Sequence, residues 1–288
     1  MIETKASSRG SLDGLRFSLV GPGRVGKSLA GWAVAAGAEM VAATGRDGLV
    51  GFGSEGQDLL LIAVPDSVLA EVAERLARRP QAGVALHTSG SRDAAVLSPL
   101  RAAGTAAGTL HPLKAFPRVL SAPGEASGVF FALDGEPAAL ALGRRLVAAW
   151  GGVAGEVPPG ARPLYHFAAT LAAGGVATLL AAAADLAARA GLPPEVARGY
   201  LELARGTVAA AIATPAPGAA LAAITGPVAR GDLATVQSHF EALKAVAPER
   251  LDLARELARE TLRQVSTVQD PSPGHRALLA WLDQEPHG

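Results

Sequence analysis

Three side chains that could exchange protons or hold a carbonyl group lie in two short segments. Ser89 belongs to His-Thr-Ser-Gly-Ser at residues 87–91, and His111 and Lys114 belong to Gly-Thr-Leu-His-Pro-Leu-Lys-Ala-Phe at residues 108–116. Imidazole is the usual group for proton exchange near neutral pH. His111 could therefore deliver the proton that hydride transfer to a carbonyl or an imine requires. Lys114 is a rival donor or a partner for a substrate carboxylate, and Ser89 could hydrogen-bond the substrate carbonyl. In the alternative interpretation, His111 and its following proline only shape a turn.

Three glycines near the start of the chain predict the turn that would place a cofactor beside these groups. Gly21, Gly23 and Gly26 follow an apolar run in the spacing G-x-G-x-x-G, and a small-residue helix follows them. The first glycine permits the tight turn, the second lets the backbone approach a pyrophosphate, and the third lets helix and strand pack closely. We expect the pyrophosphate at the helix N-terminus, held by Gly21, Gly23, Arg24, Val25 and Gly26.

The same stretch also matches the phosphate-binding loop of ATP- and GTP-hydrolysing proteins. Its spacing G-x-x-x-x-G-K-S would use Lys27 on phosphate and Ser28 on magnesium. The apolar run before Asp66 could be matched to a strand with a magnesium-binding aspartate. Pro65 between that run and Asp66 indicates a helix cap instead. The remaining motifs must separate these interpretations.

The end of the second predicted strand bears on the choice of dinucleotide. An Asp or Glu about 20 residues beyond the glycines typically holds the ribose hydroxyls of NAD. Here Thr44 ends the strand and Arg46 follows, a cation that could meet a 2′-phosphate. We therefore expect NADP, with NAD possible because Asp47 comes next; alternatively, Arg46 is only a solvated loop residue. The residues expected to line the nicotinamide site are Val64, Pro65 and Ser89.

Strands alternate with helices up to residue 157, which predicts a doubly wound α/β domain. Between Thr44 and Asp58 the sequence predicts a bare loop where a parallel sheet normally has a crossover helix. After residue 157 long Ala- and Leu-rich helices take over. We therefore predict two domains, residues 1–157 and an all-helical domain of residues 158–288. The uncharged run Pro163 to Ala184 is long enough to span a bilayer, but its Ala-, Gly- and Thr-rich composition favours a buried central helix.

Two residues of the helical half are weaker candidates for contact with a substrate. His166 opens the long central helix, one face of which could look into a cleft between the domains. Arg230 lies just before Asp232, a predicted helix N-cap. The structural alternatives are a hydrogen-bonded helical histidine and an arginine that pairs across a domain or subunit contact.

Composition excludes several other classes of function. The chain has 288 residues, a formal net charge of zero and no cysteine. Neutral charge without a basic run argues against nucleic-acid binding, and the lack of cysteine excludes a disulfide or a cysteine-based zinc site. The six histidines are scattered without metal-ligand spacing. With no apolar signal segment at the start, we expect a cytoplasmic protein that binds no metal, nucleic acid or membrane.

The ordered motifs resemble a known family over nearly the whole chain. They are the glycine loop GPGRVGKSLA, a third strand ending in VPD, HTSGS, LHPLKAF, YHFAAT and TGPVARGD. The set resembles two-domain Rossmann-like oxidoreductases whose helical half is a domain of unknown function. These are related to pyrroline-5-carboxylate reductase, ketopantoate reductase and prephenate dehydrogenase.

The resemblance implies a dinucleotide-binding domain and a helical domain like that of 6-phosphogluconate dehydrogenase, buried in a homodimer. Prephenate dehydrogenases also carry a serine and then a His-Pro after the fourth strand, where the histidine acts on the substrate hydroxyl. This supports Ser89 and His111 as site residues. The sequence departs from the relatives at Gly174-Gly175, where an asparagine is expected in the central helix.

Three functions remain open on the sequence alone. The favoured one is an NADP-dependent reductase or dehydrogenase of a small oxo- or imino-acid, with the substrate between the domains. A non-catalytic dinucleotide sensor is the second, and a phosphate-loop NTPase is the third. Fold-level resemblance identifies a class of chemistry and leaves the substrate open.

Overall fold

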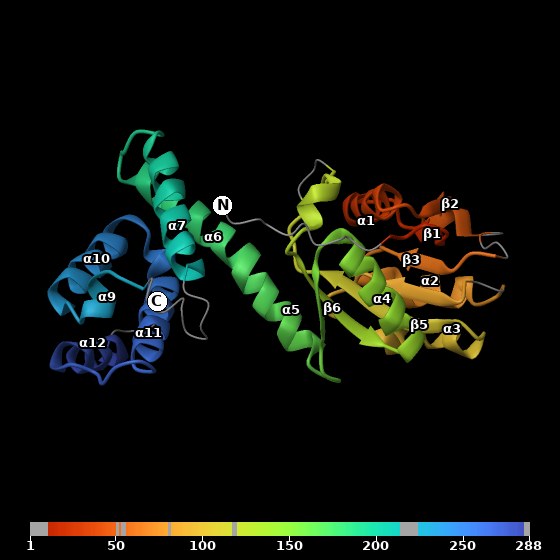
Figure 1. Cartoon of the computed structure of the whole chain (residues 1–288). Helices are drawn as coiled ribbons and strands as arrows, with labels where there is room; N and C mark the ends of the chain where they lie inside the picture. Colours follow the sequence, from red (N-terminus) through yellow and green to blue (C-terminus); the bar gives the residue numbers. More distant parts are fainter. Residues whose placement is uncertain are drawn as a thin grey trace, which may run out of the picture. The chain divides into compact units, whose positions relative to one another are not determined.

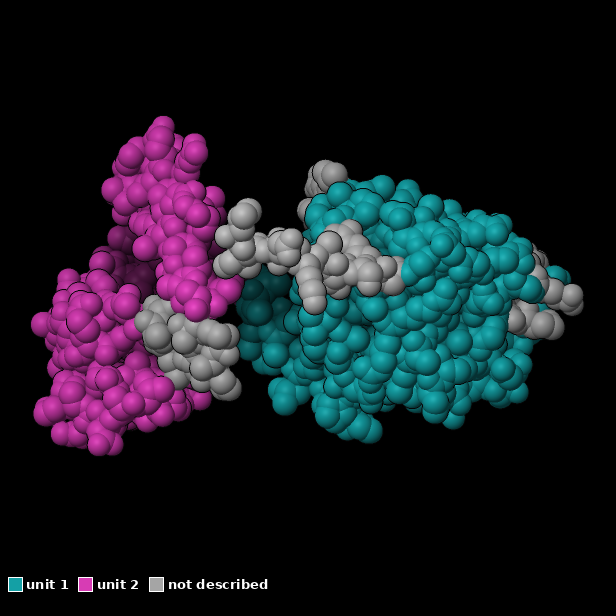
Figure 2. All heavy atoms as spheres, viewed as in Figure 1, with its two compact units in different colours: residues 1–173 teal, residues 174–288 magenta. Residues whose placement is uncertain are grey.

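The computed structural model describes residues 11–49, 52, 56–79, 82–116, 120–213 and 224–284. The chain divides into two compact units, residues 1–173 and 174–288 (Figure 2). The division falls after the first turns of the long central helix, later in the chain than the predicted domain boundary at residue 157. The beginning of that helix therefore packs with the sheet unit.

A seven-stranded sheet forms the centre of the first unit, and its order is β2-β1-β3-β4-β5-β6-β7 (Figure 1). Neighbouring strands are parallel except for the antiparallel pair β5 and β6. The predicted doubly wound α/β class is confirmed; β7 was not predicted. The strands are β1 (Arg16–Val20), β2 (Glu39–Thr44), β3 (Leu59–Ile62), β4 (Val84–His87), β5 (Ala106–Pro112), β6 (Phe130–Gly135) and β7 (Val153–Glu156).

Helices cover both faces of this sheet, because strands buried on both sides need apolar cover on both. The helices α1 (Arg24–Ala35) and α4 (Pro137–Trp150) enclose one core, in which Trp32, Phe131 and Trp150 stack edge to face or tilted. The helices α2 (Leu69–Leu76) and α3 (Ser98–Ala102) enclose the other.

The connection from β2 to β3 contains a short 3₁₀ turn, η1 (Arg46–Leu49), and no α-helix among its described residues. Leu49 is buried in the second core with Leu60, Ile62 and Leu69. One inserted leucine thus supplies apolar cover that a crossover helix would otherwise bring. For the described residues, the prediction that this connection lacks a crossover helix is confirmed.

The prediction that Asp66 caps a helix is wrong. Asp66 is the first residue of a 3₁₀ turn, η2 (Asp66–Val68), which precedes α2 and has no side-chain cap. Its carboxylate Oδ2 instead accepts a hydrogen bond from the hydroxyl of Ser91 at 2.5 Å. Asp66 therefore joins the loops that follow β3 and β4. After β4 the chain forms a 3₁₀ turn, η3 (Ala94–Leu97), and then α3.

The described part of the second unit is all helical, as predicted. A small core of Val236, Phe240, Ala258, Leu262 and Leu278 holds its C-terminal helices together. Asp232 is confirmed as an N-cap, since its carboxylate accepts from the backbone N–H of Thr235 at 3.1 Å. The helices are α6 (Val176–Arg189), α7 (Val196–Ile212), α9 (Pro227–Arg230), α10 (Leu233–Val246), α11 (Leu251–Val265) and α12 (Pro273–Gln284).

The long central helix runs through α5 (Arg162–Thr170), a π-helical turn (Leu171–Gly175) and α6. It is the one helix of the described chain that is long and apolar enough to cross a membrane, a test of length and composition alone. Only 6% of its most apolar window is buried, and Leu164 and Phe167 are 73% and 58% exposed. The prediction of a buried central helix is therefore wrong for the single chain.

Candidate active site

The glycine turn has the local geometry that its spacing predicts. Gly21 has φ of 89°, a left-handed conformation that favours glycine. A Cβ at Gly26 would lie closer than 3.0 Å to the carbonyl oxygen of Gly21 and 3.1 Å from the Cβ of Ala63. Gly23 has no atom within 4 Å of its Cβ position and caps α1 without a side-chain bond. The backbone at the start of α1 is therefore open to an approaching anion.

An open cleft of about 530 Å³ joins this turn to the loop after β3. It brings the predicted residues Gly21, Gly23, Val64 and Pro65 together, with Ser67 and Val68 beside them. Of the other predicted cofactor residues, Arg24 is exposed, Val25 packs against the first core, and Thr44 is half-buried. Arg46 begins the turn η1, and its side chain lies outside the described atoms. Ser89 is not among the residues that line this cleft.

The phosphate-loop interpretation conflicts with the position of Ser28. Its side chain is 2% exposed; the hydroxyl donates to the carbonyl oxygen of Arg24 at 2.7 Å and accepts from the backbone N–H of Ser121 at 3.2 Å. A magnesium-binding serine needs a free oxygen at the phosphate site, so Ser28 is unsuited to that role. Asp66, the matching aspartate, is occupied by Ser91.

The loop after β4 is held by a buried histidine. The Nδ1 atom of His87 accepts from the backbone N–H of Ser89 at 3.2 Å, so the proton of the neutral ring is on Nε2, 3.0 Å from the carbonyl oxygen of Asp93. Burial lowers the pKa of His87 from 6.5 to about 4. The hydroxyl of Ser89 accepts from the N–H of Arg92 at 3.1 Å, and no described residue accepts its own O–H, which can donate to a ligand.

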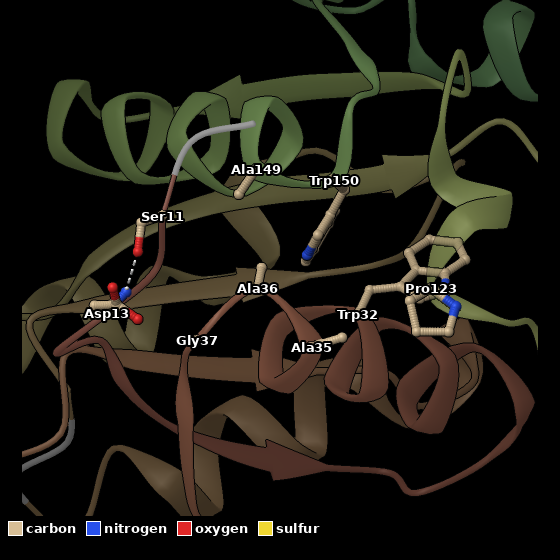
Figure 3. Close-up of a pocket in the computed structure, with 9 residues that line it drawn as sticks. All are labelled: Ser11, Asp13, Trp32, Ala35, Ala36, Gly37, Pro123, Ala149 and Trp150. Atoms are coloured by element: carbon tan, nitrogen blue, oxygen red, sulfur yellow. Dashed lines mark hydrogen bonds between the residues drawn. The ribbon is translucent and has the colours of Figure 1, made fainter. Parts of the chain in front are cut away.

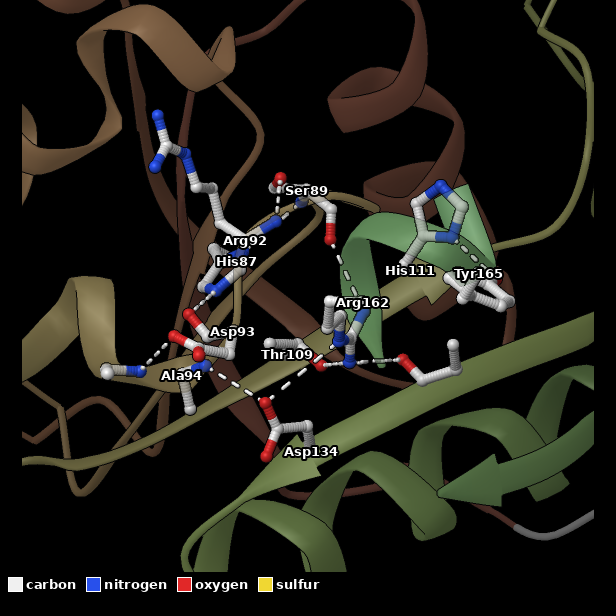
Figure 4. A network of polar contacts seen from close by, with 12 residues as sticks. His87, Ser89, Arg92, Asp93, Ala94, Thr109, His111, Asp134, Arg162 and Tyr165 are labelled. Carbon is white, nitrogen blue, oxygen red and sulfur yellow. Dashed lines mark hydrogen bonds and ion pairs between the residues drawn. The ribbon is translucent and has the colours of Figure 1, made fainter. Parts of the chain in front are cut away.

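His111 lies at the end of β5, and Figure 4 shows it beside Tyr165 of α5. Its Nδ1 atom is 2.8 Å from the phenol oxygen of Tyr165, and its ring meets the ring of His166 edge to face at 5.8 Å. Burial is the main cause that lowers the pKa of His111 to about 4, with His166 and Arg162 adding to it. Burial also raises the pKa of Tyr165. At neutral pH the pair is therefore a neutral imidazole and an un-ionised phenol.

Gly90 packs directly against the imidazole rings of His111 and His166. A Cβ at this position would lie closer than 3.0 Å to Nδ1 of His166 and to Nε2 of His111. The Nδ1 atom of His166 is buried and has no hydrogen-bond partner in the described chain. The structure thus brings His111 and His166 together beside Ser89, the residue before Gly90. Tyr165 and Gly90 were given no role on sequence; the aromatic pair Tyr165-His166 at a helix start was the signal that could have found Tyr165.

Arg162, the first residue of α5, is buried next to these site residues. Its side chain is only 2% exposed, and the guanidinium donates to the Thr109 hydroxyl and, at longer range, to the carbonyl oxygens of Ala132 and Ser89 at 3.4 and 3.5 Å. Asp134 is its ion-pair partner at 4.0 Å. Figure 4 shows this guanidinium beside Thr109, with a dashed line to Asp134. No sequence signal marked a buried arginine here.

Lys114, the predicted rival donor, takes part in a separate contact. Its ammonium group pairs with Glu125 at 3.1 Å. A backbone bond from Ala122 is the first cause, before Ser121 and Lys114, that lowers the pKa of the exposed Glu125 to about 2. Lys114 therefore carries a standing counter-ion, whereas His111 forms no ion pair with any described residue. Arg230 ends α9 in the second unit, beside a cavity of about 360 Å³ that Thr225 and Gln269 also line.

A further cavity, of about 400 Å³, opens at the C-terminal end of α1 (Figure 3). Trp32, Trp150, Pro123 and Gly37 line it, with Asp13 as the charged residue. It lies at the end of α1 opposite to the glycine turn and holds none of the predicted site residues. The described residues also contain no group of three side chains suited to a metal ion.

The fold and the site define a two-domain protein of the Rossmann-like class, whose glycine turn and imidazole–phenol pair both lie at carboxyl ends of parallel strands. Residues 52–112 match the model of a Rossmann-like domain, and residues 129–261 match a domain of unknown function, DUF2520. The chain thus combines a Rossmann-like domain with a DUF2520 domain, and the resemblance stated from its motifs is confirmed. No functionally curated protein matches the sequence.

Solved structures share the fold over nearly their whole length. A proposed NADP oxidoreductase from Bacteroides fragilis is 19% identical with a TM-score of 0.68, over 86% of this chain and 98% of that one. Plasmodium falciparum pyrroline carboxylate reductase with NADP bound is 13% identical with a TM-score of 0.56, over 86% and 98%. An imine reductase variant from Myxococcus stipitatus in complex with NAD⁺ is 16% identical with a TM-score of 0.54, over 93% and 99%. At these identities the likeness is one of fold.

The buried histidine His87 predicts a loss of stability in mild acid. An unfolded histidine takes up a proton near pH 6.5, whereas His87 in the fold does so only near pH 4. The unfolded state therefore binds more protons between these values, and the free energy of unfolding falls as the pH drops through this window. The contribution is about 3 kcal/mol, complete above pH 6.5. Urea unfolding from pH 7.5 to 4.5 measures it.

His87→Gln should remove roughly half of this pH dependence, because His111, whose pKa is also lowered to about 4, keeps its own share. The same change at the exposed His239 is the matched control. An equally steep loss of stability in the His87 variant would contradict the prediction.

Proposed function

We propose that this protein is an NADP-dependent oxidoreductase that transfers hydride to or from a small oxo- or imino-acid. The observation that carries the proposal is the 2.8 Å contact between His111 and Tyr165 beside Ser89, in a sheet whose glycine turn opens on a cleft. Open α/β sheets bind ligands at the carboxyl ends of their strands, which is where both features occur. The solved relatives named above, which include enzymes with bound NADP or NAD⁺, support the same class.

In this proposal the cofactor's pyrophosphate binds at Gly21, Gly23, Arg24, Val25 and Gly26. The adenosine end meets Thr44 and Arg46, and the 2′-phosphate pairs with Arg46. Val64 and Pro65 contact the nicotinamide, which supplies or accepts the hydride when bound. The cleft lined by Gly21, Gly23, Val64 and Pro65 supports this arrangement.

The chain's own residues then handle the proton. When Nδ1–H of the neutral His111 donates to the phenol oxygen of Tyr165, the lone pair of Nε2 is free to accept a proton. In the oxidative direction, a neutral imidazole can take the proton of a substrate hydroxyl or amine. In the reductive direction, the imidazolium form donates it. Ser89, whose O–H is accepted by no described residue, can hydrogen-bond the substrate oxygen or nitrogen. His166 and Arg230 remain proposed substrate contacts, and Lys114, held by Glu125, is the weaker choice of donor.

We also propose that the exposed apolar side chains of the central helix are covered by a second copy of this chain, in a cytoplasmic homodimer. Leu164, Phe167 and Leu171 are each more than half exposed, and apolar patches on a lone chain commonly mark such contacts. Light scattering after size exclusion in detergent-free buffer should give twice the chain mass. A stable monomer, or recovery only with membranes, would contradict it.

The function is tested by binding and then by turnover. NADPH should bind with a thermal shift and quenched or enhanced nicotinamide fluorescence, and more tightly than NADH. Turnover of oxo- and imino-acids should follow, and His111→Ala should lower kcat by about 100-fold or more, since acid–base groups typically contribute that much. Binding of NADPH without turnover of any such acid would favour the sensor, and stabilisation by ATP–Mg alone would reject the proposal.

A further inference from the structure

We propose that Arg162 is a positioning residue: its buried guanidinium fixes the first turn of α5 against β5, β6 and the loop after β4, and thereby sets the contact between His111 and Tyr165. The consequence for turnover rests on the proposed function, but the consequence for the side-chain geometry does not. Arg162 does not itself face the cofactor cleft, whose lining residues come from the glycine turn and the loop after β3.

Arg162 and Tyr165 attach one helical turn to one strand at two points. Arg162 binds the hydroxyl of Thr109, and Tyr165 binds His111, two residues further along β5. Three residues of helix rise about 4.5 Å, and two residues of strand span about 6.6 Å, so the helix start runs beside the strand. Two attachment points fix both the position and the direction of α5, whereas the Tyr165 contact alone would leave the helix free to pivot.

The same guanidinium also reaches the peptide that supports both imidazoles. Arg162 Nη1 lies 3.5 Å from the carbonyl oxygen of Ser89, and the next residue is Gly90, against which His111 and His166 pack. Tyr165 and His166 follow Arg162 by three and four residues, so the three side chains share one face of the helix. One side chain thus contacts the strand of His111, the loop of Gly90 and, through its own helix, Tyr165 and His166.

The arrangement is costly for a residue that only fills space. A charged side chain in the protein interior loses its hydration. The ion pair between Arg162 and Asp134, at 4.0 Å, is long and compensates only part of this loss. The Nε atom of Arg162 is buried without a hydrogen bond in the described chain. The Asp134 carboxylate is 24% exposed and also accepts from the backbone N–H of Ala94 at 3.1 Å, so it keeps solvent and one donor when Arg162 is replaced by an apolar side chain. An apolar replacement can therefore keep the fold and lose the alignment, and this difference makes the proposal testable.

The test compares Arg162→Met, Arg162→Lys and Tyr165→Phe, with Arg78→Met at an exposed arginine of the same unit as control. The readout is the ring ¹⁵N and ¹³C NMR signals of His111, assigned with His111→Gln. In the wild-type background, Tyr165→Phe should shift the His111 Nδ1 signal, because it removes a hydrogen bond. In the Arg162→Met background the same change should have little effect, since the contact is already lost. Arg162→Lys should restore part of the coupling.

Activity gives a second readout if the enzyme turns over. Arg162→Met should lower kcat by about 10- to 100-fold while the Kd of NADPH stays within a factor of three, and the Arg162→Met/Tyr165→Phe double variant should be no slower than Arg162→Met alone. If Arg162→Met does not fold, Thr109→Val, which removes only the hydroxyl, should weaken the His111–Tyr165 coupling in the same direction.

Additive NMR shifts in a folded Arg162→Met protein would overturn the proposal, as would an unchanged Tyr165 effect in Thr109→Val. Absence of any turnover, with the NMR coupling as expected, would instead count against the proposed function and leave the role of Arg162 intact.

Discussion

Gly26→Ala should weaken NADPH binding by about 100-fold or more. The added methyl group would lie closer than 3.0 Å to the carbonyl oxygen of Gly21 and 3.1 Å from side-chain atoms of Leu19 and Ala63. These neighbours are backbone and packed core atoms, so α1 must move away from β1. The N–H groups at the start of α1 would move with it, and a hundredfold loss corresponds to about 2.7 kcal/mol. Isothermal titration with NADPH measures the effect.

Gly31→Ala on the same helix is the matched control. Gly31 has no atom within 4 Å of its Cβ position, and alanine is favoured over glycine in a helix by about 1 kcal/mol. This variant should bind NADPH normally and unfold at a slightly higher temperature. Lys27→Ala should also bind normally, because Lys27 is exposed and the phosphate-loop role is rejected here. Gly26→Ala that binds within a factor of three of wild type would show that the pyrophosphate binds elsewhere.

Gly90→Ala should lower turnover by about 100-fold or more and leave NADPH binding within a factor of a few. Its methyl group would meet both Nδ1 of His166 and Nε2 of His111. The two rings must separate from the loop or from each other, and either movement displaces His111 from Tyr165 and Ser89. The loss should equal that of His111→Ala, because the same proton transfer is removed. Steady-state kinetics with the best acid substrate and a parallel NADPH titration measure the two effects.

Gly83→Ala, at the other end of β4, provides the control for a glycine substitution near this strand. The nearest atom to its Cβ position is a carbonyl oxygen at 3.8 Å, an ordinary contact. Turnover of Gly83→Ala should match wild type. Normal turnover of Gly90→Ala would show that the imidazole pair takes no part in the reaction.

The glycine turn could be predicted from sequence because its constraints are local. The left-handed conformation of Gly21 and the close approach of Gly26 to the carbonyl oxygen of Gly21 are both set within six residues, so the spacing carries this part of the geometry. The alternation of strands and helices likewise predicted the sheet. The short turn η1 was consistent with the absence of a helical pattern, although the burial of Leu49 was not visible in it.

The site itself could be predicted only in part, because its partners are distant in sequence. His111 was a candidate from its residue type and its place after a strand, but Tyr165 reaches it across 54 residues. The Asp66 prediction failed for the same reason, since the proline before it suggested a cap while Ser91, 25 residues later, holds the carboxylate. The burial of Arg162 could not be predicted either, because its partners Thr109 and Asp134 lie on β5 and β6, far from α5 in the sequence.

The central helix shows a different limit of prediction from sequence. Its apolar composition correctly predicted a helix, but composition cannot tell whether the apolar side chains are covered by the same chain or by another molecule. In the single chain they are exposed.

The start of α5 has a consequence for how this protein can be divided and recombined. The Rossmann-like match contains Ser89, Gly90 and His111, whereas the DUF2520 match contains Asp134, Arg162, Tyr165 and His166. A chimera that keeps residues 1–157 and takes its helical half from a relative would inherit the partner of His111 from the donor. In such exchanges the glycine turn, at which we propose that the dinucleotide binds, would stay with one parent, while His111 and its partner Tyr165 would come from different parents.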